Sequence, residues 1–350
     1  MIRIAVLVVC LLSVSSAAFA TDWSSARYFP SFKAASTNPV DPKYQEIFQA
    51  VSKDSLMGFL KSMTGYASVT AGGKTFFIKE RYSPQSKALF RAYWSQYFQS
   101  LGMATQELAF HTQQNIGENQ GHNLEAILPG QSKDSIVIIV HYDSTGPWGQ
   151  ETSNPGVDDD MTGMATMLET ARILALHKSD LKYTVRFVAA DYEELGGLEG
   201  AREYALYVQN LSKQQGFKLV AAVDNEQSGW NCAADSSCRV GGTGHIFDVF
   251  SCSNDSRHYN SAAMGDALAA IASTYSPAMS VNRGCIGENS DHYAMWEIGV
   301  PAVVFSEHSP FNNPHFDQSG GDTLEKIDQD YFFRIAQIGV TFAASLAIPH

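Results

Sequence analysis

Short apolar stretches alternate with longer amphipathic stretches through the middle of the chain. The apolar stretches predict strands over residues 135–141, 183–190, 218–224 and 301–306. Apolar residues recur at helical spacing over 44–60, 86–101, 164–177, 198–209, 262–275 and 330–346. Strands that are apolar on both faces require helices on both sides of their sheet. The pattern therefore predicts an α/β protein with a mostly parallel central sheet flanked by helices on both faces.

The first twenty residues have the pattern of a secretory signal. Arg3 precedes an apolar run over residues 4–14, and Ala18-Phe19-Ala20 supplies the small residues of a cleavage site. The run is too short to span a membrane comfortably. We expect residues 1–20 to be a signal peptide, 21–42 a leader or loose arm, and 43–350 one domain. We also expect a secreted or periplasmic protein.

The charge balance argues against some partners. The formal net charge is −12, and loss of Arg3 with the signal would make it −13. No basic stripe is present, so nucleic acid is not expected as a partner. No second apolar segment approaches membrane length, so no membrane span is expected in the mature chain.

Four cysteines follow the signal, and an even number in an exported chain indicates disulfides. The most local pairing joins Cys232 to Cys238 and Cys252 to Cys285. The alternative is a zinc site, but the 232–238 spacing fits a short chelating turn poorly and an oxidising compartment favours disulfides. The segment at about 229–260 is rich in Gly, Ser, Asn and Cys and is interpreted as a disulfide-tied insertion.

Acidic and histidine side chains lie at the carboxyl ends of the predicted strands, where α/β sheets bind ligands. They are His141 and Asp143 after the first strand, Glu193 and Glu194 after the second, Asp224 at the third, and Asp158, Asp159 and Asp160 before a helix. Adjacent carboxylates repel each other unless a cation or a proton lies between them. Three acidic clusters together with one imidazole favour zinc.

Each cluster also has a simpler interpretation. His141 could be a hydrogen-bonded core residue, Asp158 to Asp160 could complement a helix dipole, and Glu193 and Glu194 could be solvated turn residues. Three consecutive acids exceed what a helix dipole needs, and a zinc-bound imidazole commonly has a nearby carboxylate such as Asp143. Two adjacent glutamates can divide the work, one binding metal and the other moving a proton.

Five motifs in this order carry a family resemblance: HYDS (141–144), PGVDDDMTG (155–163), EELGGLEGA (193–201), VDNE (223–226) and SDHYAMWEIGVPAVVFSE (290–307). Together they resemble the secreted co-catalytic zinc aminopeptidases of the bacterial leucyl aminopeptidase type, over about residues 44–347. The resemblance implies the three-layer zinc exopeptidase fold and two zinc ions.

The resemblance also implies roles for individual residues. His141 and Asp224 would bind one zinc, Glu194 and a late histidine the other, and Asp159 would bridge the two. Glu193 would be the general base, with Asp143, Asp160 and His292 around the site. His315 is preferred as the late ligand over Asp317, with His308 and His292 as further alternatives.

These expectations describe a secreted metallo-aminopeptidase that hydrolyses N-terminal residues from peptides. One alternative is a glutaminyl cyclase, which shares the fold, typically holds one zinc and closes a ring instead of hydrolysing a bond. Another is an inactive peptidase-like binding scaffold. A serine hydrolase is disfavoured, because the strand-to-helix turn at 163–165 is Gly-Met-Ala and lacks a nucleophilic serine.

Overall fold

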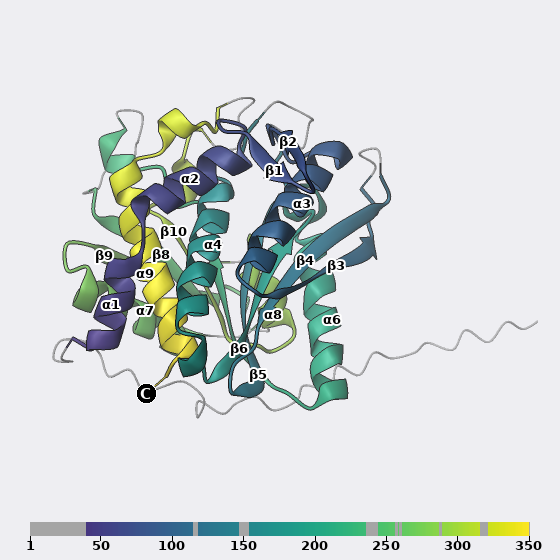
Figure 1. Cartoon of the computed structure of the whole chain (residues 1–350). Helices are drawn as coiled ribbons and strands as arrows, with labels where there is room; N and C mark the ends of the chain where they lie inside the picture. Colours follow the sequence, from purple (N-terminus) through teal and green to yellow (C-terminus); the bar gives the residue numbers. More distant parts are fainter. Residues whose placement is uncertain are drawn as a thin grey trace, which may run out of the picture.

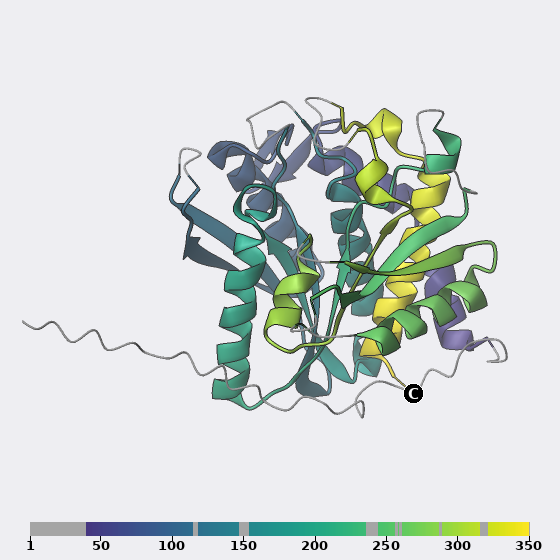
Figure 2. The same ribbon diagram turned by 180° about the vertical axis from the view of Figure 1, so that it is seen from behind.

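The computed structural model describes residues 40–114, 118–146, 154–235, 244–255, 258, 261–286, 289–315 and 321–349. Within these ranges the chain forms one mixed eight-stranded sheet with helices packed on both faces (Figure 1, Figure 2). The expected signal peptide at 1–20 and nearly all of the expected arm at 21–42 lie outside the described residues.

The predicted strands form the parallel centre of this sheet. From one edge to the other its strands are β3 (Ala104–His111), β4 (Gln120–Leu128), β6 (Tyr183–Ala190), β5 (Ser132–His141), β7 (Leu219–Asn225), β10 (Ala302–Glu307), β8 (Ile246–Ser253) and β9 (Ser280–Ile286). Strands β6, β5, β7 and β10 pair in parallel. The pairs β3–β4, β4–β6 and β10–β8 are antiparallel, and β8–β9 is parallel. The sheet is therefore mostly parallel, as predicted, but its edges were not predicted.

Helices occur at every stretch with predicted helical spacing, and the two short helices Glu193–Gly196 and His292–Glu297 were not predicted. They are α1 (Pro42–Ala50), α2 (Lys53–Met63), α3 (Pro84–Ser100), α4 (Met161–Leu176), α5 (Glu193–Gly196), α6 (Glu199–Gln215), α7 (Ala262–Tyr275), α8 (His292–Glu297) and α9 (Gln329–Ala347). The minor elements are the hairpin β1 (Val69–Ala71) and β2 (Lys74–Phe76) and the 3₁₀ turns Lys178–Asp180, Cys232–Ala234, Pro310–Asn312 and Leu324–Lys326. No helix among the described residues is long and apolar enough to cross a bilayer.

One predicted helix divides into two. The expected helix over 44–60 ends at Ala50, and a new one begins at Lys53. Ser52 adopts an extended conformation and its hydroxyl accepts a hydrogen bond from the backbone N–H of Ser55, which caps the start of α2. The buried carboxylate of Glu169 in α4 accepts from the Ser52 N–H and holds this break against the body of the protein.

The two faces of the sheet bury different clusters of apolar side chains. In β5, Ile136, Ile138 and Val140 pack in the cluster that includes residues of α4 and α9. Val137 and Ile139 pack in the other cluster, with residues of α6 and α8. Successive side chains of a strand point to opposite faces, so burial on both faces explains the unbroken apolar run in β5.

The segment 229–260 is not only an insertion, because it contains strand β8 of the main sheet. Phe247 and Val249 of β8 enter the core on the α9 side, which the polar composition of the segment did not indicate. The predicted Cys252–Cys285 disulfide is confirmed and joins β8 to β9, with the two Cα atoms 4.6 Å apart. Cys238 lies outside the described residues, so its pairing with Cys232 stays a prediction.

Removal of the Cys252–Cys285 disulfide is expected to lower the free energy of unfolding by about 3–4 kcal/mol. The estimate follows from the lost constraint on the unfolded chain for a separation of 33 residues. Urea unfolding of the Cys252→Ala/Cys285→Ala variant, compared with the oxidised wild-type protein, measures the effect. An unchanged urea midpoint would contradict this estimate and show that the disulfide adds little to stability.

Candidate metal centre

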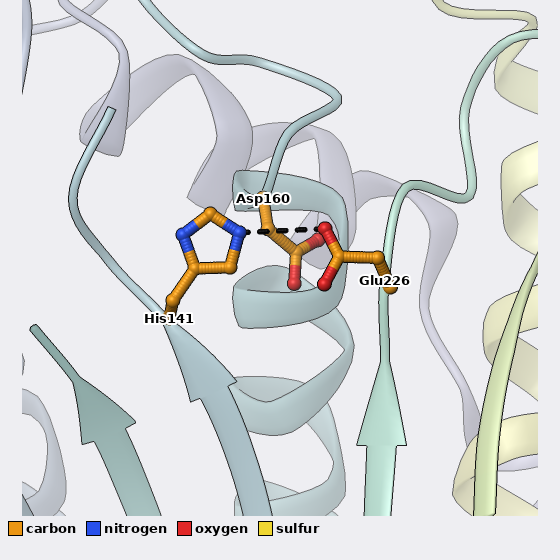
Figure 3. Close-up of side chains that lie close together, drawn as sticks. All are labelled: His141, Asp160 and Glu226. Carbon is orange, nitrogen blue, oxygen red and sulfur yellow. Dashed lines mark hydrogen bonds and ion pairs between the residues drawn. The ribbon is translucent and has the colours of Figure 1, made fainter. Parts of the chain in front are cut away.

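The carboxyl ends of β5, β6 and β7 bring acidic residues and one histidine to the same edge of the sheet. Figure 3 shows His141 at the end of β5, Asp160 at the start of α4 and Glu226 directly after β7, with their side chains directed toward one another. Helix α4 can approach the end of β7 because residue 163 is glycine. A Cβ atom there would collide with the Asn225 carbonyl oxygen.

His141 is the centre of this arrangement. It is fully buried, and its Nε2 atom lies 3.0 Å from Asp159 Oδ1 and 3.3 Å from Glu226 Oε1. Two groups could each hold a metal ion: His141 with Asp160 and Glu226, and His141 with Asp159 and Glu194. Within each group the candidate ligand atoms lie within 4.8 Å of one another.

The electrostatics of the cluster favour a cation. Burial raises the pKa of Asp159 to about 6. The hydrogen bond with His141 lowers this pKa, and the negative charge of Glu226 raises it further. Burial and the Glu226 charge also raise the pKa of Asp160 well above its usual range. Burial alone would lower the pKa of His141, but the surrounding carboxylates outweigh it and raise that pKa.

An unsatisfied oxygen points to the same conclusion. Within the part of the chain that the structure describes, nothing hydrogen-bonds to Asp160 Oδ2, although Asp160 is fully buried. A buried carboxylate oxygen without a partner is costly, and a metal ion would satisfy it. The donor set of carboxylates and one imidazole fits zinc, and oxygen-preferring divalent cations as well.

Buried carboxylates hold the backbone of the candidate ligands. Asp143 accepts hydrogen bonds from the backbone N–H groups of Glu193 (3.1 Å) and Glu194 (3.2 Å), so it orients the glutamate pair. Asp322 does the same for Asp158 (2.8 Å) and Asp159 (2.9 Å). Both acidic loops are therefore fixed by side chains from other parts of the chain.

A buried arginine holds the loop after His141 and the loop before Asp158. Arg81 is fully buried and donates to the carbonyl oxygens of Tyr142, Pro155 and Gly156 at 2.7, 2.7 and 3.0 Å. Burial lowers its pKa to about 10, although neighbouring carboxylates oppose that change, so the guanidinium remains charged at neutral pH. It links the loop after His141 to the loop before Asp158.

Asp224, implied as a ligand by the resemblance, lies outside both groups. Its Oδ2 atom accepts from Ser290 Oγ at 2.6 Å and from the His292 backbone N–H at 3.1 Å. The register of the sheet explains this, because Ile139 of β5 is level with Asp224 of β7. His141 is two residues further along β5, and so the residue that meets it is Glu226, two residues beyond Asp224.

His315 also lies outside both groups, with its Nε2 atom 3.1 Å from Asp235 Oδ2. The alternatives also lie outside both groups: His308 Nδ1 lies 2.8 Å from Asp248 Oδ1, and His292 Nδ1 lies 3.4 Å from Asp224 Oδ2, with its ring against that of Trp296. Asp317 lies outside the described residues. Among the described histidines, His141 alone belongs to a candidate metal group.

The sequence pattern did not identify two residues of this site. Glu226 is in the VDNE motif, and residues two apart in a strand face the same side, so the alternation of β7 could have identified it as an alternative to Asp224. Asp322 is the second of these residues. Its part in holding Asp158 and Asp159 depends on a contact between distant segments, which no local pattern indicates.

A pocket opens beside the cluster. Its acidic side consists of Asp159, Glu193, Glu194 and Glu226. Its apolar lining consists of Phe250, Val304, Pro310 and Phe311, and the remaining lining residues are polar: Gln227, Asn289, Ser290 and Ser306. A site of this kind suits a molecule with a cationic end and an apolar side chain.

Fold and site together define an α/β protein with a candidate metal centre at the carboxyl edge of its sheet. The chain belongs to peptidase family M28, whose family model matches residues 123–343. The probable leucine aminopeptidase of Arthroderma otae is 27% identical over 233 residues, 64% of this chain and 57% of that protein. Leucine aminopeptidase 1 of Chaetomium globosum is 22% identical over 336 residues, 93% of this chain and 76% of that protein. The chain thus spans little more than half of the first of these relatives.

Solved structures show the same fold. The LapA aminopeptidase of Legionella pneumophila matches with a TM-score of 0.66 at 19% identity, over 91% of this chain and 78% of that one. A glutaminyl cyclase of Macrostomum lignano matches with a TM-score of 0.64 at 16% identity, over 89% of this chain and 94% of that one. Since the fold is common to both kinds of enzyme, the activity has to be argued from the site.

Proposed function

We propose that the protein is a metal-dependent aminopeptidase that removes N-terminal residues from peptides and uses zinc. The observation that carries the proposal is the glutamate pair: Glu194 shares a candidate metal group with His141 and Asp159, and Glu193 lines the same pocket. Membership of peptidase family M28 and the leucine aminopeptidase relatives support this activity over the alternatives.

We propose that the members of the two groups are the metal ligands: His141, Asp159, Asp160, Glu194 and Glu226. Both groups contain His141, and their members would hold the two zinc ions that the resemblance implies. When bound, the metal would polarise the scissile carbonyl group and make water more acidic. We base this assignment on the two candidate groups. Asp224 and His315 lie outside both, so their roles as ligands stay predictions of the resemblance.

Glu193 would act as the general base and then as the general acid of the reaction. Desolvation raises the pKa of its carboxyl group well above the usual range. The charge of His141 lowers this pKa, whereas the charges of Glu226 and Asp291 raise it. A glutamate with a raised pKa can take a proton from the attacking water and then deliver it to the leaving amine. Asp143 holds the Glu193 backbone N–H, which keeps the carboxylate directed at the pocket.

The pocket would select the end of a peptide. The acidic side of the pocket would attract the positively charged amino terminus of the substrate. The apolar lining, with Phe250 and Phe311, would contact the first side chain. We therefore propose peptides with large apolar N-terminal residues as substrates.

We also propose that the protein is exported. The pattern of residues 1–20 supports this, and so does the Cys252–Cys285 disulfide, because disulfides persist mainly in oxidising compartments.

Purified protein is expected to release p-nitroaniline from leucine p-nitroanilide, to lose this activity with a zinc chelator and to regain it when zinc is added. The chelator would remove the cation that the proposed ligands hold, and added zinc would restore it. A parallel assay follows ring closure of an N-terminal glutaminyl peptide. Ring closure without hydrolysis would identify a cyclase instead, and neither reaction in folded, metal-loaded protein would support a binding scaffold.

A further inference from the structure

Lys87, in the first turn of α3, is a buried cation next to the segment that carries the glutamate pair. Its Nζ atom lies 2.7 Å from Asp191 Oδ1, and both side chains are 0% exposed. Glu118 Oε1 is 3.8 Å away on the other side. Burial of a lysine and an aspartate is costly unless their contact is close and well supported. The contacts of Lys87 and Asp191 with their neighbours therefore indicate the role of this ion pair.

Asp191 connects the lysine to the backbone of the segment. Its Oδ1 atom accepts from the N–H of Tyr192 at 3.1 Å, and its Oδ2 atom accepts from the N–H of His122 at 3.0 Å. The Asp191 N–H in turn donates to Asn123 Oδ1 at 3.0 Å. The end of β6 is thus tied to β4 through one buried carboxylate.

Tyr192 has an unusual backbone conformation directly before the glutamate pair. Its φ of 58° lies in the left-handed region, which is unfavourable for a bulky residue. Such a conformation persists only when several contacts hold it. Here the Lys87 ammonium lies 3.7 Å from the centroid of the Tyr192 ring, and the Tyr192 hydroxyl donates to Glu118 at 3.0 Å.

We infer that Lys87 is a positioning residue for Glu193 and Glu194. It holds the Asp191 carboxylate and the Tyr192 ring together, and so it maintains the left-handed turn from which both glutamates extend. Without that turn, the backbone N–H groups of the pair would not meet Asp143. The roles of the two glutamates rest on the proposed function, whereas the positioning itself does not.

Lys87→Met is expected to lower kcat by about 10–100-fold and to weaken metal affinity by a similar factor, with KM changed less than about twofold. Loss of a group that orients a metal ligand has effects of this size. Chelator competition measures the affinity, and leucine p-nitroanilide kinetics measure kcat and KM separately. Lys43→Met is the matched control, because it removes the exposed ion pair with Asp180 and should change none of these values. Wild-type kcat and metal affinity in folded Lys87→Met would overturn the inference.

Lys87→Met leaves the Asp191 carboxylate buried without its cation, so this variant alone could fail to fold. The Lys87→Met/Asp191→Asn variant removes both charges and is expected to fold while keeping the lowered kcat and metal affinity. A crystal structure of this variant is expected to show Tyr192 outside the left-handed region. An unchanged Tyr192 conformation, or wild-type metal affinity, would overturn the inference. The structural result stands even if the enzyme proves not to be an aminopeptidase.

Discussion

Replacement of Glu193 by glutamine is expected to lower kcat by about 10²–10⁴-fold, the usual contribution of general acid–base catalysis. Glutamine has nearly the same shape but cannot accept the proton of the attacking water. The Asp143 contact involves the backbone N–H of residue 193 and should survive the change. Kinetics with leucine p-nitroanilide and metal analysis of the same sample measure both properties.

The metal content separates the roles of the two glutamates. Glu193→Gln should keep the metal content of the wild-type protein, because Glu194 is the member of the pair in the candidate group. Glu203→Gln changes an exposed glutamate on α6 and serves as the matched control. Activity above about one tenth of the wild-type value would exclude Glu193 as the base. Loss of metal together with activity would instead make Glu193 a ligand.

Glu226→Gln is expected to weaken metal affinity by more than the roughly 10–100-fold effect of losing a group that only orients a ligand. The Glu226 carboxylate lies 3.3 Å from His141 Nε2 and belongs to the same candidate group, so its charge acts directly on a bound cation. Chelator competition gives the affinity without relying on catalysis, and loss of activity at limiting zinc is the second measure.

Asp224→Asn tests the alternative ligand at the same strand end. The Asp224 carboxylate accepts from Ser290 and from the His292 backbone, and an amide oxygen can still accept both hydrogen bonds. Metal affinity should therefore change much less than in Glu226→Gln. If Asp224→Asn loses the metal and Glu226→Gln keeps it, the ligand assignment based on the resemblance holds and ours is wrong.

The hydrophobic pattern was sufficient for the centre of the fold. Strands β5, β6, β7 and β10 and helix α7 appear where their apolar residues predicted them, because burial on both faces leaves a continuous apolar run. Strands β3, β4, β8 and β9 were missed. In β3 the described side chains are mostly exposed or half-buried, and β8 lies in a segment rich in polar residues, so neither carries a strong apolar pattern.

The position of acidic and histidine residues relative to the predicted strands indicated which edge of the sheet carries the candidate metal centre, and most of its residues. His141, Asp143 and Glu194 come together because they end or follow strands that end at the same edge, and Asp159 joins them from the start of α4. His315 was preferred as the late ligand over Asp317 on the resemblance alone. The resemblance could not show that the His315 ring lies beside Asp235.

The sequence by itself determined the class of fold, the edge of the sheet that carries the chemistry, and the kinds of side chain that gather there. The tertiary structure alone decided which carboxylates meet His141, because the register between β5 and β7 places Glu226, and not Asp224, level with it. It also decided the buried contacts of Arg81, Asp322 and Lys87. Periodicity is a property of neighbouring residues, whereas register and long-range contacts depend on how separate segments pack together.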